Sequence, residues 1–390
     1  MNSDILIAGG GIGGLAAALA ITRAGSRVRL FEQADAWGEI GAGVQLGPNA
    51  TRLLRDWGLE KPLAEIAAFP RQLTVNRMGD GAPLARLRLG QGMRTRYGAP
   101  YYTVHRADLH ALLLKAVRGC GAELQLGQRI AQISQTSDTV HLQLADGRAA
   151  QGSLLVGADG VWSRVREQVL ADGVAGPSGH LAYRALVAQT ELPAALRSRD
   201  VTVWLGAHAH VVAYPVRRGE WLNIVAVVEG VPPVAQDWDQ PGEGADLRAV
   251  LGQVCPGLES LARAPQTWRL WPLHARAPMS GPGEMARGRV ALLGDAAHPM
   301  LPYLAQGAAM AIEDAAELGS VLAPERSADL PAALQQYAQA RWQRCARVQR
   351  RARRNGVIFH ATGPLRWGRD LSLRLLGERL LDLPWLYGHR

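Results

Sequence analysis

The chain has 390 residues, 48% hydrophobic and 20% charged, which excludes a disordered protein and is typical of a globular one. Its formal charge of +9 raises the question of nucleic acid, but the basic residues are spread along the chain and the 11 tryptophans do not alternate with them, so we expect no nucleic-acid partner. No window has the roughly 20 apolar residues of a transmembrane segment, and the three scattered cysteines form no disulfide framework or metal motif, so we expect a cytoplasmic protein without a metal site.

The chain opens with the pattern of a strand, a glycine turn, a helix and a second strand. Residues 4–8 and 27–31 are typical of short strands, and the alanine-rich residues 15–24 favour a helix. In the G-x-G-x-x-G between them, the glycines permit a tight turn, close approach of a pyrophosphate and close helix packing. The helix N-terminus attracts phosphates, and an acid after the second strand can bind the adenosine ribose. The pattern predicts dinucleotide contacts from Gly9, Gly11, Ile12, Gly13, Gly14 and Glu32.

The middle of the chain carries a second turn and then several strands. Residues 154–166 indicate a strand, the turn Gly157-Ala158-Asp159-Gly160 and a helix. Residues 201–205, 210–216 and 221–227 are typical of strands in an antiparallel sheet, which can roof a pocket. His210 and Tyr214 have the same parity and therefore project from one face of their strand.

A third turn follows a strand at residues 289–293. Asp295 comes directly after this strand, where it can hold ribitol hydroxyls of a long cofactor or cap the next helix. That helix begins near Gly307 and Ala308, and its positive end would stabilise an anionic reduced flavin. Seven arginines between 341 and 354 lie on a helix predicted from about Leu334. A solvated helix face, on which the arginine stems cover apolar surface, is favoured over a contact with an acidic lipid, a nucleic acid or a protein.

The three turns, in this order, resemble the single-component FAD-dependent aromatic hydroxylases, which have the fold of 4-hydroxybenzoate hydroxylase. The string from His298 to Gly307 is most similar to the branch of 3-hydroxybenzoate 6-hydroxylase, salicylate hydroxylase and 6-hydroxynicotinate hydroxylase. The resemblance implies an NAD(P)H-dependent flavoprotein monooxygenase that hydroxylates a small phenolic or aromatic acid through a C4a-hydroperoxyflavin. It implies non-covalent FAD, NADH or NADPH as a transient co-substrate, and O2.

The resemblance also implies roles for individual residues. Glu32 would bind the adenosine ribose and Asp295 the ribityl chain, while Asp159 is linked to both FAD and the nicotinamide dinucleotide. The remaining predicted FAD contacts are Val44 and Gln45 in a loop beside the isoalloxazine, Arg106 at the phosphates and ribityl chain, and Ile130 near the adenine. A surface salt bridge to Asp108 is the alternative for Arg106.

In the same branch, a His and a Tyr at the spacing of His210 and Tyr214 line the substrate pocket. A phenolate is a better target for an electrophilic oxygen than a phenol, and a neutral imidazole can take the phenolic proton. We therefore expect His210 to be the base or its relay and Tyr214 to orient the substrate. A satisfied structural histidine is the alternative, and His208 shares the parity of His210. Pro302 and Tyr303 depart from the polar residue and the His of near relatives, which leaves the ring substrate open.

Together these features predict an α/β fold: a Rossmann-like FAD-binding domain interleaved with a β-sheet substrate domain, and a helical C-terminus. The predicted FAD-binding domain comprises 1–70, 100–170 and 285–333, the substrate domain 71–99 and 171–284, and the helical segment 334–390. The alternatives are a flavin dehydrogenase or oxidase that transfers no oxygen, a non-catalytic FAD-binding protein, and a ubiquinone-type hydroxylase. The oligomeric state stays open, a homodimer included.

Overall fold

The computed structural model describes residues 4–38, 42–230, 240–323 and 329–389. Its contacts group the chain into two units, each assembled from three separate stretches of sequence. Unit 1 comprises 1–40, 107–176 and 274–352, and unit 2 comprises 41–106, 177–273 and 353–390.

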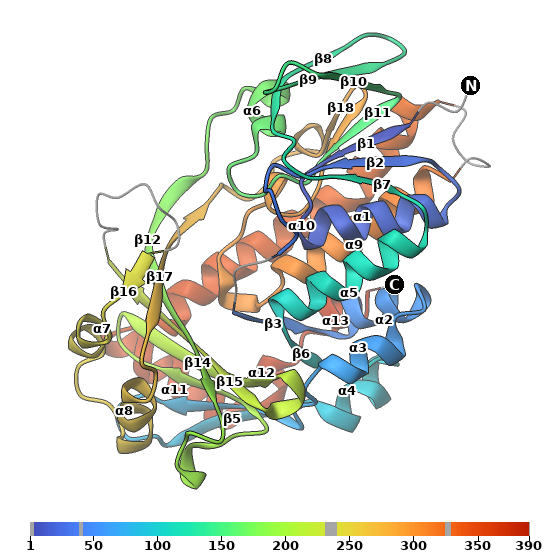
Figure 1. Ribbon diagram of the computed structural model, residues 1–390. Helices are drawn as coiled ribbons and strands as arrows, with labels where there is room; N and C mark the ends of the chain where they lie inside the picture. The colour runs from blue at the N-terminus through green and yellow to red at the C-terminus, as the bar shows by residue number, and fades with distance from the viewer. Residues whose placement is uncertain (1–3, 39–41, 231–239, 324–328, 390) are drawn as a thin grey trace. The chain divides into compact units, whose positions relative to one another are not determined.

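Unit 1 is built on a six-stranded sheet in the order β18-β19-β11-β1-β2-β7, in which β1 runs parallel to both of its neighbours. All four residues of β1 are buried apolar side chains, as expected for a parallel strand covered on both faces. Helices α1 and α9 lie side by side (Figure 1), and a Cβ at Gly319 would come within 2.9 Å of Ala20. The sheet strands are β1 (Ile5–Ala8), β2 (Val28–Phe31), β7 (Glu123–Gln125), β11 (Leu154–Gly157), β18 (Ala286–Arg287) and β19 (Val290–Leu292).

The other elements of unit 1 are a three-stranded antiparallel sheet and the helices. The small sheet has the order β10-β9-β8, with β8 (Ile130–Gln135), β9 (Val140–Leu144) and β10 (Ala149–Gly152). The helices are α1 (Ile12–Arg23), α5 (Arg106–Gly119), α6 (Arg164–Leu170), α9 (Gly307–Val321) and most of α10 (Leu330–Phe359), with short 3-10 turns η3 (Pro282–Glu284), η4 (Gly294–Ala296) and η5 (Pro302–Leu304).

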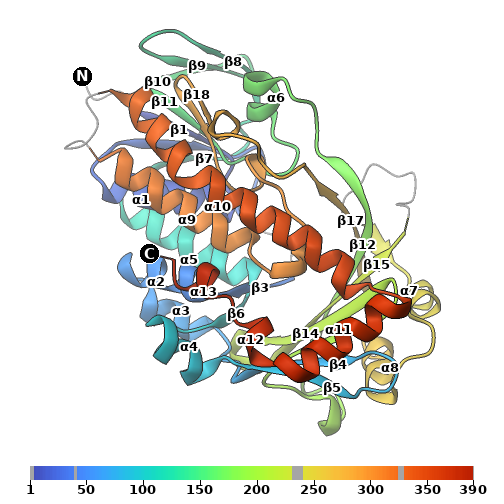
Figure 2. The ribbon, with the colours of Figure 1, turned by 180° about the vertical axis from the view of Figure 1, so that it is seen from behind.

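Unit 2 is built on an eight-stranded sheet in the order β16-β17-β12-β15-β14-β13-β4-β5. Its strands are β4 (Gln72–Arg77), β5 (Pro83–Arg88), β12 (Gly176–Ala188), β13 (Val201–Leu205), β14 (Ala209–Val216), β15 (Trp221–Glu229), β16 (Gln240–Gly242) and β17 (Trp268–Ala275). A separate pair joins β3 (Gly43–Leu46) to β6 (Tyr102–His105). Figure 2 shows the C-terminal helices α11 and α12 beside β5. The helices are α2 (Pro48–Asp56), α3 (Glu60–Ile66), α4 (Gly90–Tyr97), α7 (Gly244–Leu251), α8 (Pro256–Arg263), α11 (Gly363–Leu376), α12 (Glu378–Leu381) and α13 (Pro384–Tyr387), with 3-10 turns η1 (Ala194–Leu196) and η2 (Arg217–Gly219).

The two faces of the eight-stranded sheet have different compositions. Ala209, Val211 and Ala213 of β14 belong to one hydrophobic core with residues of α7 and α8. Because side chains alternate along a strand, His210 and Tyr214 lie on the opposite face. That face is mixed, because Val203, Leu205 and Val212 on it belong to or pack against a second hydrophobic core. His210 and Tyr214 are polar members of this face, which is called the polar face below.

The arginine-rich stretch lies on α10. Two of its arginines lie neither on a solvated face nor at a contact with another molecule. Arg341 and Arg344 are buried and form ion pairs of 2.8 Å and 2.6 Å with Glu313 of α9, and Arg341 also pairs with Asp314 at 2.8 Å. These buried arginines bind helix α10 to helix α9. Of the other five, Arg347, Arg350, Arg353 and Arg354 are exposed, as the solvated-face prediction expects, and Arg351 is half-buried.

The fold class is as predicted: a mixed α/β chain with parallel and antiparallel sheets and a helical C-terminus. The contacts group residues 41–70 and 100–106 with the eight-stranded sheet in unit 2, where β3 and β6 pair with each other. The sequence predicts both stretches in the FAD-binding domain. Which stretches bind FAD stays a prediction. Within the described parts of the chain, no helix combines the length and the apolarity of a membrane span.

Candidate cofactor and substrate site

The glycine turn of unit 1 leaves no room for side chains. Gly9 has a φ of +100°, and a Cβ there would lie 2.5 Å from the carbonyl oxygen of Ala158. A Cβ at Gly14 would lie 1.9 Å from the carbonyl oxygen of Gly9. Helix α1 begins at Ile12 after the N-cap Gly11, and no described side chain caps it. The result is a helix N-terminus without a side-chain cap, which suits a phosphate.

Glu32 follows β2 and reaches back to this turn. Its carboxylate accepts hydrogen bonds from the N–H of Gly10 at 2.6 Å and of Ala34 at 2.8 Å, while the residue stays partly exposed. A carboxylate has about four acceptor positions, so two backbone bonds fix it and leave capacity for ribose hydroxyls.

Asp159, in the second turn, holds the start of helix α6. Its carboxylate accepts hydrogen bonds from the Ser163 hydroxyl at 2.5 Å and from the Val165 N–H at 3.0 Å, and Ser163 caps α6 by accepting from the Arg166 N–H at 2.9 Å. Desolvation raises the pKa of Asp159, and these hydrogen bonds act in the opposite direction. This side chain is committed to local structure, and its link to FAD or to a nicotinamide dinucleotide stays a prediction.

The third turn is fixed by Asp314 of α9. Its carboxylate accepts a hydrogen bond from the Gly294 N–H at 3.0 Å and contacts the Nε2 atom of His298 at 2.6 Å, with both side chains fully buried. Burial opposes charge on His298, but its interactions with Cys345 and Asp314 raise its pKa well above the usual value. Burial also raises the pKa of Asp314, and the charges of His298 and Arg341 outweigh it and hold that pKa far below the usual value. The turn therefore rests on a buried ion-pair network.

Asp295 and the start of α9 lie next to this network. Asp295 is exposed on η4, whereas the N-cap of α9 is Gln306, so the capping alternative for Asp295 is not what the structure shows. Gly307 and Ala308 are partly exposed at the first turn of α9, and no described side chain caps that helix. An exposed acid and an uncapped helix N-terminus fit a ribityl chain and an electron-rich ring.

The predicted loop beside the isoalloxazine comprises residues 41–46, of which Gly41 lies outside the described residues, and Gly43–Leu46 form strand β3 of unit 2. Tyr214 holds the first residue of this strand. The Tyr214 hydroxyl donates a hydrogen bond to the Gly43 carbonyl at 2.6 Å, and the Gly43 N–H donates to the Asn223 side-chain oxygen at 2.8 Å. A Cβ at Gly43 would lie 2.5 Å from the Tyr214 ring. Burial raises the pKa of Tyr214, so its hydroxyl keeps its proton. Tyr214 therefore positions β3, and its contact with a substrate stays a prediction.

The remaining predicted cofactor contacts also have defined positions. The Gln45 side-chain oxygen accepts a hydrogen bond from the Tyr101 hydroxyl at 2.7 Å, and Val44 precedes it on β3. Arg106 is the first residue of α5 and donates its backbone N–H to the carbonyl of Ala42 at 3.1 Å. The buried residue Ile130 opens β8 in unit 1.

His210 is buried on the polar face of the eight-stranded sheet, where it contacts a residue that sequence reasoning missed. Its Nδ1 atom lies 2.9 Å from the Nε2 atom of His360, and its ring packs edge-on against Phe359. Burial, together with His360 and His180, holds the pKa of His210 well below its usual value. His360 follows α10, 150 positions away, and no local pattern in the sequence marks it.

The structure separates His208 from His210. His208 lies before β14 in a left-handed conformation with φ of +59°, and its side chain is 63% exposed. Its Nδ1 atom lies 2.6 Å from the carboxylate of Glu229. His210, and not His208, is therefore the buried histidine on the polar face.

The turns of unit 1 fit the adenosine diphosphate part of FAD, because a Cβ would fill the cradle at Gly9 and Gly14 and the carboxylate of Glu32 stands at its edge.

A family model described as an FAD binding domain matches residues 2–352. A 3-hydroxybenzoate 6-hydroxylase from Polaromonas naphthalenivorans is 39% identical over 388 residues, covering 98% of this chain and 95% of that protein. A 6-hydroxynicotinate 3-monooxygenase from Bordetella bronchiseptica is 39% identical over 354 residues, 89% of each protein. The solved structure of HpxO from Klebsiella pneumoniae, complexed with FAD and uric acid, has a TM-score of 0.86 at 28% identity and covers 97% of this chain and 94% of that one.

The chain belongs to this FAD-binding family. Membership confirms the predicted resemblance, the cofactor FAD and the enzyme class, a flavoprotein aromatic monooxygenase. The roles predicted for individual residues stay predictions, and they enter the proposal below.

Proposed function

We propose that this flavoprotein uses NAD(P)H and O2 to hydroxylate a small phenolic acid of the hydroxybenzoate type, with His210 accepting the phenolic proton. The observation that carries the proposal is the buried His210 imidazole, hydrogen-bonded to His360 on the polar face of the sheet. Relatives named for 3-hydroxybenzoate and 6-hydroxynicotinate support this substrate class.

The residues of unit 1 would hold the cofactor. The first turn of α1 would bind the pyrophosphate, Glu32 the ribose and Asp295 the ribityl chain, while the positive end of α9 would favour the reduced ring. Bound FAD, reduced by NAD(P)H, would supply an electrophilic oxygen atom taken from O2. Ile130, Val44, Gln45 and Arg106 are the further contacts that the resemblance supports.

The chain's own residues would prepare the substrate. Burial keeps the His210 imidazole unprotonated at neutral pH, so it has a lone pair for the phenolic proton, although the same lowering of its pKa makes it a weaker base than a free imidazole. Removal of that proton turns a phenol into the more nucleophilic phenolate. The bond between the Nδ1 atom of His210 and His360 fixes the ring orientation and offers a path by which the proton leaves. Tyr214 would act indirectly, because its hydrogen bond to Gly43 holds strand β3 in position.

A panel of hydroxybenzoates and hydroxypyridines tests the proposal, scored for NADH and NADPH oxidation and for product. With 18O2, one labelled oxygen atom should appear in the product, and unlabelled product would establish a dehydrogenase instead. His210→Ala should retain FAD and lower hydroxylation by about 100-fold or more, the usual contribution of a positioned base. His208→Ala is the matched control and should leave turnover unchanged. Wild-type turnover by His210→Ala with the same substrate would remove His210 from the mechanism.

A further inference from the structure

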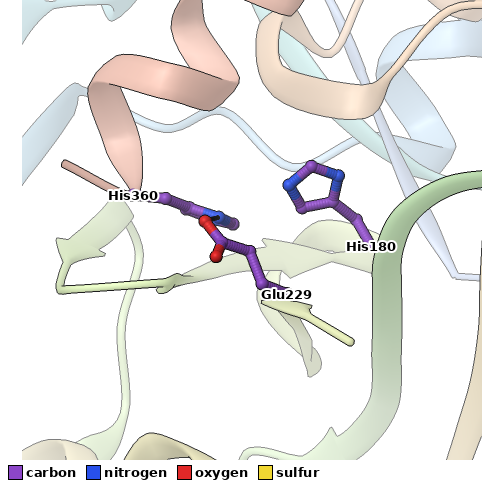
Figure 3. A group of neighbouring side chains, drawn as sticks. All are labelled: His180, Glu229 and His360. Atoms are coloured by element: carbon purple, nitrogen blue, oxygen red, sulfur yellow. Dashed lines mark ion pairs between the residues drawn. The ribbon is translucent and has the colours of Figure 1, made fainter. Parts of the chain in front are cut away.

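Three polar side chains converge on the polar face of the eight-stranded sheet, beside His210. His180 of β12 and Glu229 of β15 are direct cross-strand partners, and His360 approaches from the end of α10. One ring nitrogen of each histidine and one carboxylate oxygen all lie within 4.8 Å of one another. Figure 3 shows the two imidazoles and the carboxylate grouped together.

Each of the three side chains is oriented by an outer contact. The Nδ1 atom of His180 lies 3.1 Å from the carbonyl oxygen of Ser178. Because a carbonyl oxygen only accepts, Nδ1 carries the proton in this bond and Nε2 carries the lone pair that a metal needs. The Nε2 atom of His360 bonds His210, while its Nδ1 atom lies 3.4 Å from Glu229. The second oxygen of Glu229 contacts His208. Metal ligands in proteins are held by such second contacts, which fix the tautomer and the ring orientation.

We propose that His180, Glu229 and His360 bind one divalent transition-metal ion of the Zn2+ type. Two imidazoles and one carboxylate are the ligand types that zinc takes, and a fourth position stays open for water. Bonds of about 2.0–2.2 Å require ligand atoms roughly 3.3 Å apart, so metal binding requires the exposed side chain of Glu229 and the half-buried one of His180 to rotate inward from the present spacing. With a single carboxylate, the group suits Zn2+, Cu2+ or Ni2+ better than Mg2+ or Ca2+.

A second group, His298, Asp314 and Cys345 in unit 1, has comparable spacing. All three side chains are buried, and Asp314 already forms an ion pair with Arg341 at 2.8 Å. A cation there would compete with an internal guanidinium, which favours the group around Glu229 as the metal site.

Metal binding would act on the proposed reaction, and this consequence rests on the proposed function. An ion on the Nδ1 atom of His360 leaves its Nε2 atom as a hydrogen-bond donor to His210, because a metal-bound imidazole keeps its second N–H. His360 could then no longer accept a proton from His210. The metal-loaded enzyme should therefore hydroxylate more slowly than the metal-free enzyme.

The test uses the full-length FAD-loaded enzyme, stripped with a chelator and titrated with Zn2+ by calorimetry and equilibrium dialysis. One ion per chain is expected, with affinity lowered by more than about 10-fold in His180→Asn and Glu229→Gln. His141→Asn, a histidine on β9 of unit 1, is the control and should bind as the wild type does. FAD absorbance verifies that each variant is folded.

Absence of saturable Zn2+ binding, or equal binding by His180→Asn and Glu229→Gln, would overturn the site. Inhibition of hydroxylation should follow the same titration and disappear in His180→Asn. Stoichiometric binding without inhibition would keep the site and refute its connection to His210. If the proposed substrates are not turned over, the proposed function fails while the binding measurement still decides the metal site.

Discussion

Asp314 is the residue at which one change tests the buried network of unit 1. In Asp314→Asn the side chain keeps its shape and loses its charge. Its two oxygens contact the Gly294 N–H, the His298 ring and the Arg341 guanidinium at 3.0, 2.6 and 2.8 Å. The amide would leave one oxygen to accept hydrogen bonds and place an NH2 group against a donor.

The expected cost follows from the burial of the partners. Removing one member of a buried ion pair destabilises a protein by about 3–5 kcal/mol, because the remaining charge is left uncompensated. Arg341 keeps its 2.8 Å contact with Glu313, which reduces the loss on that side. We therefore expect a fall in the free energy of unfolding of about 3 kcal/mol.

Urea denaturation followed by far-UV circular dichroism measures this difference, with FAD fluorescence as a separate report on the turn after β19. Glu259→Gln is the control, because it makes the same chemical change in an exposed ion pair with Arg263. The side chain of Glu259 is 51% exposed and that of Arg263 is 61% exposed, so the loss of this pair should cost about 0.5 kcal/mol or less. Equal stability of Asp314→Asn and Glu259→Gln would refute the conclusion that the network holds unit 1 together.

Three further changes follow from the same contacts. Tyr214→Phe should cost about 1–3 kcal/mol in urea denaturation, because the carbonyl of Gly43 loses its donor, and a value near zero would show that water replaces the hydroxyl. Gly14→Ala should abolish FAD retention on gel filtration, since its Cβ meets backbone oxygen at 1.9 Å, whereas Gly119→Ala meets no described atom within 4 Å and should retain FAD. The folded-state pKa of Asp314 is depressed, so its stabilisation is fully present above the unfolded value of 3.8 and is lost progressively as the pH falls from that value through the folded-state pKa. The stability gap between the wild type and Asp314→Asn should therefore shrink in acid, and a gap unchanged at pH 3 would contradict this assignment.

The local sequence pattern was sufficient to predict the strands and helices that carry the glycine turns and the polar face. Strand β13 covers residues 201–205 as predicted, and β14 begins one residue before its prediction, because alternating side chains specify both a strand and its faces. The same reasoning placed His210 and Tyr214 on one face.

Partners distant in the chain were beyond such reasoning. His360 meets His210 across 150 positions, and Arg341 meets Glu313 across 28, and both contacts depend on the end position and rotation of α10. The role of Tyr214 in orienting the substrate stays a prediction, and the bond of its hydroxyl to Gly43, 171 positions away, is a contact that the sequence does not predict. Periodicity specifies which way a side chain points from its element, and the partner depends on how the elements pack.

The interleaving of the two units has a consequence for how the protein is made. Strand β11 needs β19, about 135 residues later, to complete the sheet of unit 1, and unit 2 needs residues beyond 352. Neither unit can finish folding on the ribosome until nearly the whole chain has emerged, and until then the apolar strands β1 and β11 depend on partners not yet synthesised. Expression in cells should accordingly be sensitive to the supply of chaperones, and fragments cut at the unit boundaries should aggregate rather than fold.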